Sequence, residues 1–124
     1  MNNIKSNNIK VRTYQFSISI IKFISELPNK KIFFSIGDQL LRSATSIGAN
    51  IIEAQASISR KEFIKYFQIS LKSSNESEYW LKLLTDSFPE YHSQIFNLLN
   101  ENIEISKMLG ASLLTLKGKK NNPI

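Results

Sequence analysis

The residue types that usually perform catalysis or hold metals are scarce in this chain of 124 residues. It has no cysteine, which excludes thiol catalysis, disulfides and cysteine-built zinc sites. Its single histidine, His92, leaves no second imidazole for a multi-histidine metal site within one chain. A carboxylate di-iron bundle needs two Glu-x-x-His motifs, and the residue three before His92 is Pro89. The sequence therefore predicts no catalytic residue, no metal site, no cofactor and no enzyme activity.

The charges point instead towards binding. Lysine and arginine number 16 against 10 acidic residues, so the formal charge is +6, and such an excess attracts phosphate groups. In a four-helix bundle the second connection and both chain ends lie together, which would gather basic residues there with the N-terminal arm. The predicted nucleic-acid-binding residues are Arg60, Lys61, Lys65, Lys117, Lys119 and Lys120. The alternative interpretation is ordinary solubilising charge.

A second candidate site is a polar strip on one predicted helix. Arg42, Ser46, Asn50 and Glu53 follow the spacing i, i+4, i+8 and i+11, which places them along one side of that helix. Two interpretations stay open. The strip is either a solvated face, or a hydrogen-bonded ladder that fixes helix register or lines an oligomer contact.

The next predicted helix carries Glu76, Glu78 and Trp80. Glu76 and Glu78 are two residues apart and point to different sides, so they cannot act as a joint acid–base pair within one helix. Glu76 and Trp80 share a face. We expect Trp80 to anchor a core or an interface, and base stacking is the alternative role.

Four helices must position these residues. Valine occurs once and threonine four times, whereas strands favour both, and apolar residues recur at helical spacing along the chain. The predicted helices begin near Val11, Lys31, Ser59 and Ser87, and the last ends at Gly118. Ser59 and Ser87 each open a Ser-x-x-Glu capping box. Residues 1–10 are predicted to form a flexible arm, 11–118 the helical domain and 119–124 a flexible tail.

Short connections make neighbouring helices antiparallel, so the sequence predicts an all-α, up-down-up-down four-helix bundle. The first helix is apolar on two faces, one through Val11, Tyr14, Ile18 and Ile21 and the other through Phe16, Ile20, Phe23 and Leu27. Gly48 within the second helix indicates a close approach of another helix. Excess apolar surface on so small a domain predicts self-association.

Residues 42–84 resemble the four-helix-bundle proteins encoded in intervening sequences of 23S ribosomal RNA genes. The resemblance extends loosely over residues 10–118. The second helix carries the family pattern at Arg42, Ser46, Ile47, Gly48, Asn50, Ile51 and Glu53. The third helix matches at its start through Ser59, Lys61, Glu62, Phe63 and Ile64, and later through Glu76, Glu78, Tyr79, Trp80 and Leu81.

This resemblance implies a homopentamer, with five bundles arranged as a barrel around a central channel. It also implies kinship with the basic accessory protein of diversity-generating retroelements, which binds nucleic acid and a reverse transcriptase. The family has no established biochemical activity.

Two functional hypotheses follow. The first is a non-enzymatic, homopentameric bundle that associates with nucleic acid, in particular structured RNA. The second is a scaffold that holds a partner enzyme without binding nucleic acid. We expect a cytoplasmic protein without a membrane span, because the longest uncharged runs are about ten residues where a span needs roughly 20, and the first twelve residues have no apolar signal core.

Overall fold

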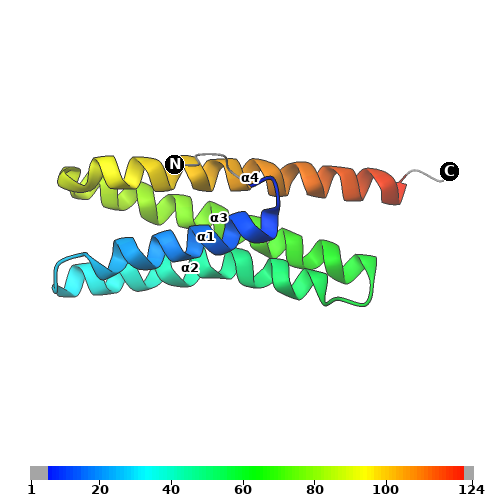
Figure 1. Cartoon of the computed structure of the whole chain (residues 1–124), viewed down its shortest axis with the longest axis horizontal. Helices are drawn as coiled ribbons and strands as arrows, with labels where there is room; N and C mark the ends of the chain where they lie inside the picture. Colours follow the sequence, from blue (N-terminus) through cyan, green and yellow to red (C-terminus); the bar gives the residue numbers. More distant parts are fainter. Residues whose placement is uncertain (1–5, 122–124) are drawn as a thin grey trace.

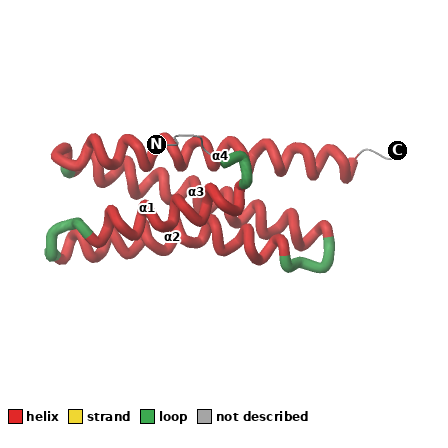
Figure 2. Tube along the Cα trace, in the orientation of Figure 1, coloured by secondary structure: helices red, strands yellow, loops and turns green. Residues whose placement is uncertain are grey.

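A computed structural model describes residues 6–121, with side chains through Gly118, and the described chain folds into four helices (Figure 1). They are α1 (Ile9–Ser25), α2 (Lys31–Gln55), α3 (Arg60–Ser87) and α4 (His92–Asn121), with a short 3₁₀ turn, η1 (Pro89–Tyr91), before α4. Figure 2 shows only helices and short connections in this part of the chain. The predicted all-α fold of four helices is confirmed.

Side-chain caps fix where two of the helices begin. The Asn8 side chain accepts hydrogen bonds from the backbone amides of Lys10 and Val11, so α1 begins at Ile9, two residues before the predicted start. Ser59 Oγ accepts from the amide of Glu62 at 3.1 Å, as the capping box predicts. Both caps satisfy amides that the helix itself leaves without acceptors.

The predicted cap at Ser87 is wrong. Ser87 is the last residue of α3, whose final turn closes through the Phe88 amide donating to the Leu84 carbonyl at 2.8 Å. Phe88 leaves the helical conformation, and Pro89 then opens the 3₁₀ turn that leads into α4. The Phe88 ring packs 4.6 Å from the Phe33 ring, which holds the connection against α2. The other end of α4 continues past the predicted stop at Gly118 to Asn121.

Of the two apolar faces of α1, one enters the core. Phe16, Ile20 and Phe23 are buried, whereas Tyr14 is 68% exposed and Ile21 49% exposed. The buried cluster draws on all four helices and consists of Phe16, Ile20, Phe23, Leu40, Ala44, Ile47, Ile51, Ala54, Ile64, Phe67, Leu81, Leu84, Ile95, Leu98, Ile105, Leu109 and Leu113. The outer face of α1 therefore remains unpartnered in the single chain.

Small polar residues join α3 to its neighbours inside this core. Ser77 Oγ donates to Ser43 Oγ at 2.9 Å, and Ser70 Oγ donates to the Ile47 carbonyl at 2.8 Å. On the side of α4, Ser74 Oγ donates to Asn102 Oδ1 at 2.8 Å. Small side chains permit close packing, and their paired hydroxyls avoid the cost of buried polar atoms without partners. We call these contacts the serine seam.

Gly48 has the role that the sequence predicts for it. A Cβ atom at this position would lie 3.2 Å from the Thr13 Oγ1 atom of α1, which is tighter than ordinary packing. The missing side chain therefore lets α1 approach α2 closely at the level of Thr13.

Candidate nucleic-acid interface

The candidate site lies at the end of the molecule where α2 turns into α3 and α4 finishes (Figure 1). A surface pocket of about 620 Å³ there is lined by Lys61 and Lys65 of α3 and Lys117 of α4. Ser59, Glu62, Ile64 and Gln68 complete the lining, so one carboxylate lies among the three lysines. The structure thus brings together three of the six residues predicted to bind nucleic acid. We call this the basic pocket.

The sequence places these lysines through two separate elements. Lys61 and Lys65 are four residues apart and so share one side of the first turns of α3, whose start is fixed by the Ser59 cap. Lys117 reaches the same pocket because α4 continues through it to Asn121. All three lysine side chains are exposed, so their charges remain available to a ligand.

Arg60 lies at the same end but is engaged with the protein. Its Nη2 atom donates to the Leu116 carbonyl oxygen at 2.7 Å, which ties the first residue of α3 to the last turns of α4. It lines a neighbouring pocket of about 380 Å³ with Phe63 and Leu116 instead of the basic pocket. Arg60 therefore positions α4 as well as adding charge.

The other predicted parts of the basic site are two lysines near the end of α4 and the N-terminal arm. The side chains of Lys119 and Lys120 lie outside the described residues, although α4 extends through both positions. The described part of the predicted arm does not reach the basic pocket. The Ser6 carbonyl accepts a 3.2 Å hydrogen bond from Arg12, whose guanidinium also contacts Met108 in the middle of α4.

The polar strip on α2 is solvated at its ends and bonded in its middle. Arg42 Nε donates to Asp38 Oδ2 at 2.9 Å, and the Arg42 side chain is 74% exposed. Asn50 Nδ2 donates to Ser46 Oγ at 2.9 Å, and Ser46 Oγ accepts from Ser73 Oγ of α3 at the same distance. Glu53 is exposed. Ser46 and Asn50 therefore extend the serine seam, whereas Arg42 lies at the surface.

Glu76 and Trp80 share a face of α3, as their spacing predicts. Trp80 Nε1 donates to Glu76 Oε2 at 3.2 Å, and the half-buried indole packs against the core cluster. The ring of Tyr79, 60% exposed, meets the indole edge-on at 5.1 Å. Trp80 is thus an anchor with one side open to solvent.

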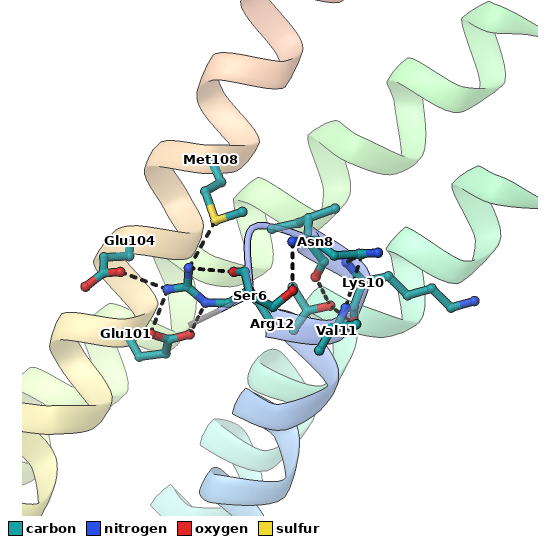
Figure 3. Close-up of polar contacts among 10 residues, drawn as sticks. Ser6, Asn8, Lys10, Val11, Arg12, Glu101, Glu104 and Met108 are labelled. Atoms are coloured by element: carbon teal, nitrogen blue, oxygen red, sulfur yellow. Dashed lines mark hydrogen bonds and ion pairs between the residues drawn. The ribbon is translucent and has the colours of Figure 1, made fainter. Parts of the chain in front are cut away.

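An ion-pair cluster around Arg12 was not predicted from the sequence. Figure 3 shows the Arg12 side chain of α1 directed at α4, where its Nε and Nη2 atoms donate to the two oxygens of Glu101 at 2.7 and 2.8 Å. Nη2 also donates to Glu104 Oε1 at 2.8 Å. Arg12 is only 5% exposed, and its hydrogen bonds to Glu101 raise its pKa despite the opposing effect of burial. We call this cluster the Arg12 clamp.

A largely apolar groove lies on the outer side of α1 and α2. It measures about 750 Å³ and includes Val11, Tyr14 and Ile18 of α1. Across it lie Ala49 and Ile52 of α2, with Gly48 at the helix contact. These α1 residues belong to the outer apolar face that the sequence indicates, and they are exposed in the single chain.

The described residues offer neither a metal cluster nor a membrane-spanning helix. No group of three or more His, Cys, Asp or Glu residues among them is arranged to hold a metal ion. None of the helices in the described part of the chain is long and apolar enough to span a bilayer. His92 is exposed, with its Nδ1 atom 3.1 Å from Thr85 Oγ1.

Comparisons with known proteins agree on one family. A family model described as 23S rRNA-intervening sequence protein matches residues 5–111. The chain is also similar to the crystal structure of a protein of unknown function from the S23 ribosomal protein family of Bacteroides thetaiotaomicron VPI-5482. These two share 38% sequence identity with a TM-score of 0.80, and the match covers 86% of this chain and 98% of the other. No curated protein sequence matches the chain.

Proposed function

Because this chain belongs to the 23S rRNA-intervening sequence protein family, we propose that it is a non-enzymatic, cytoplasmic bundle that associates with structured RNA. The observation that carries the proposal is the basic pocket, where Lys61, Lys65 and Lys117 line one surface hollow from two helices. Phosphate groups are the natural ligands of clustered ammonium groups, and they supply most of the sequence-independent affinity for nucleic acids.

Assembly would strengthen this association. We propose that the antiparallel, up-down-up-down bundles form the homopentameric barrel that the family resemblance implies. Five copies would carry a formal charge of +30, five times the +6 of one chain, and would present five basic pockets to one ligand. The implied kinship with the basic accessory protein of diversity-generating retroelements supports the same function.

The proposal is tested by fluorescence anisotropy with a labelled structured RNA and nuclease-treated protein. Replacing Lys61, Lys65 and Lys117 with Glu should weaken binding at least tenfold at near-physiological salt, because each lost phosphate contact also removes a released counterion. A matched control replaces Lys22, Lys30 and Lys31 with Glu. This changes the net charge equally, but these exposed residues lie near the opposite end of the bundle. If both variants lose binding equally, or if neither loses binding, the basic pocket is not the RNA-binding site.

The outer groove of α1 and α2 supports the assembly part of the proposal. Tyr14 is 68% exposed and lines this groove with Ile18 and Ile52, so a second copy would remove apolar surface from water. Tyr14→Glu should lower the mass measured by light scattering while the helix content stays unchanged. Ser19→Glu adds the same charge to α1 outside the groove and should leave the mass unchanged. A Tyr14→Glu protein of wild-type mass would remove this groove from the assembly.

The second candidate function is a scaffold for a partner protein. It is supported by the exposed Tyr79 ring, which stacks edge-on against the half-buried Trp80, since aromatic side chains are enriched at protein interfaces. A partner recovered in stoichiometric amount from nuclease-treated extract would favour this function. The Trp80→Ala variant should no longer recover this partner, whereas the variant with Glu at Lys61, Lys65 and Lys117 should still recover it.

A further inference from the structure

Three separate hollows lie around the amino-terminal turns of α3. The basic pocket shares Ser59 with the pocket beside Arg60. That second pocket shares Phe63 and Leu116 with a third, of about 380 Å³, whose walls are Phe63, Phe67, Ala111, Ser112, Thr115 and Leu116. The lysines therefore line the first hollow, and Phe63 lines the second and third on the other side of the same turns of α3. We call the third hollow the aromatic pocket.

The aromatic pocket is open because α1 is short. Thr13 of α1 packs on Gly48 of α2, and Ser70 of α3 donates to the carbonyl of Ile47, the residue before Gly48. Thr13 and Ser70 therefore lie at about the same height along the bundle axis. α1 extends only four residues beyond Thr13, about 6 Å, because the Asn8 cap ends it. Phe63 lies seven residues before Ser70, about 10 Å along α3. No part of α1 therefore runs beside Phe63.

The ring of Phe63 is placed to receive a flat partner. It stacks on Phe67 with centroids 4.8 Å apart and an interplanar angle of 21°. Phe67 is buried, whereas Phe63 is only half-buried and borders both small pockets. Ala111, Ser112 and Thr115 form the facing wall with short side chains, which leaves room for a ring.

We propose that this end of the bundle binds single-stranded nucleic acid, with an unpaired base stacked on Phe63 and phosphates farther along the same strand at Lys61, Lys65 and Lys117, on the other side of α3. The inference rests on the proposed function and narrows it, because a structured RNA would be held at a loop, bulge or end. Aromatic rings accept any base by stacking, and a paired base within a duplex offers them no face. The positive charge of the three lysines matches phosphates of the same strand.

The test compares two ligands of one sequence at near-physiological salt. One is a labelled 12-nucleotide single-stranded RNA, and the other is the same strand in a blunt duplex. We expect the wild-type chain to bind the single strand at least tenfold more tightly. Phe63→Leu keeps apolar volume but removes the aromatic face, and should weaken single-strand binding about fivefold or more while leaving duplex binding unchanged.

Two further variants make the result specific. Ala111→Leu places a larger side chain at an exposed wall position and should weaken single-strand binding without touching the Phe63–Phe67 stack. Phe34→Leu changes an exposed phenylalanine of α2 (62% exposed) and should leave both affinities unchanged. It controls for loss of any surface aromatic ring.

Failure of this inference differs from failure of the proposed function. Equal affinity for strand and duplex, or wild-type binding by both Phe63→Leu and Ala111→Leu, would overturn the base-stacking site. The lysine-dependent association would then still stand. If the wild-type protein binds neither RNA, both the base-stacking site and the proposed function are wrong. If an acidic helical peptide binds the aromatic pocket instead of RNA, the pocket belongs to a protein partner.

Discussion

The two ends of the bundle use the same residue type to different effect. At the end where α1 turns into α2, Phe33 of α2 packs 4.6 Å from Phe88 and 6.0 Å from Tyr91, and Phe23 of α1 meets Tyr91 at 6.4 Å. These rings come from three segments, α1, α2 and the connection between α3 and α4, and close that end. At the opposite end Phe63 and Phe67 both belong to α3 and stack on each other. Aromatic residues seal a bundle where several elements supply them, and leave an open face where one element does.

Charge follows the same division. The closed end mixes basic and acidic side chains, with Lys30 and Lys31 near Glu26 in one connection and Glu90 in the other. The open end carries Lys61 and Lys65 beside a single acidic residue of the same turns, Glu62, and Lys117 joins them from α4. The end with less aromatic packing is also the end where basic side chains outnumber acidic ones.

The largest effect should come from removing a ring at the closed end. Phe33 is 6% exposed and contacts two other rings, so Phe33→Ala should lower the free energy of unfolding by about 3–5 kcal/mol. Phe63→Ala, at the half-buried position of the open end, should cost about 1–2 kcal/mol, since less apolar area leaves water on folding. Chemical denaturation of both variants measures the two values.

This pair of substitutions tests directly whether the two ends differ in packing. Equal losses of unfolding free energy would mean that the open end is as tightly packed as the closed one, and the aromatic pocket would lose its basis. Circular dichroism of each variant without denaturant verifies that both start from the folded, helical state.

The next effect concerns the point at which α1 stops. Arg12 is 5% exposed and holds Glu101 and Glu104 with three hydrogen bonds of 2.7–2.8 Å. Arg12→Met keeps an apolar stem but leaves these carboxylates without the guanidinium. We expect a loss of about 2–3 kcal/mol, in the range for a hydrogen-bonded charged group.

Hydrogen exchange locates that effect. Amides in the first turns of α1 should lose protection in Arg12→Met, whereas those near Phe23 and Phe33 at the closed end should keep it until global unfolding. Uniform loss along α1 would show that the Arg12 clamp stabilises the whole helix and does not separate the two ends.

Much of this division could be predicted from local sequence. Helical periodicity located the four helices, the capping box gave the start of α3, and Gly48 marked the contact with α1. The bundle fold places the connection between the second and third helices beside the end of the fourth. This order predicted that Lys61, Lys65 and Lys117 would lie together. These features depend on neighbours in sequence or on helix order alone, which a single sequence displays.

The remainder depends on contacts between distant positions. Arg12 and Glu101 are 89 residues apart, and no local pattern distinguishes this arginine from a solvated one. The two apolar faces of α1 have the same spacing, so only packing reveals that Phe16 lies inside and Tyr14 outside. Ser87 has the sequence of a cap, but Phe88 packs on Phe33 and the end of α3 extends through it.

The smallest effect is expected at Arg42, and it separates folding from assembly. The Arg42 side chain is 74% exposed, and its ion pair with Asp38 is an i, i+4 surface pair, a kind that typically contributes less than about 0.5 kcal/mol. Arg42→Ala should therefore leave the denaturation midpoint of the isolated bundle nearly unchanged. If the same variant lowers the mass measured by light scattering, Arg42 acts between copies.

Ser73→Ala, which removes the hydroxyl bonded to Ser46 within one chain, should show the reverse pattern of lower stability at unchanged mass. A clear loss of stability in Arg42→Ala at unchanged mass would contradict its surface role, and would mean that the strip on α2 stabilises the fold along its whole length.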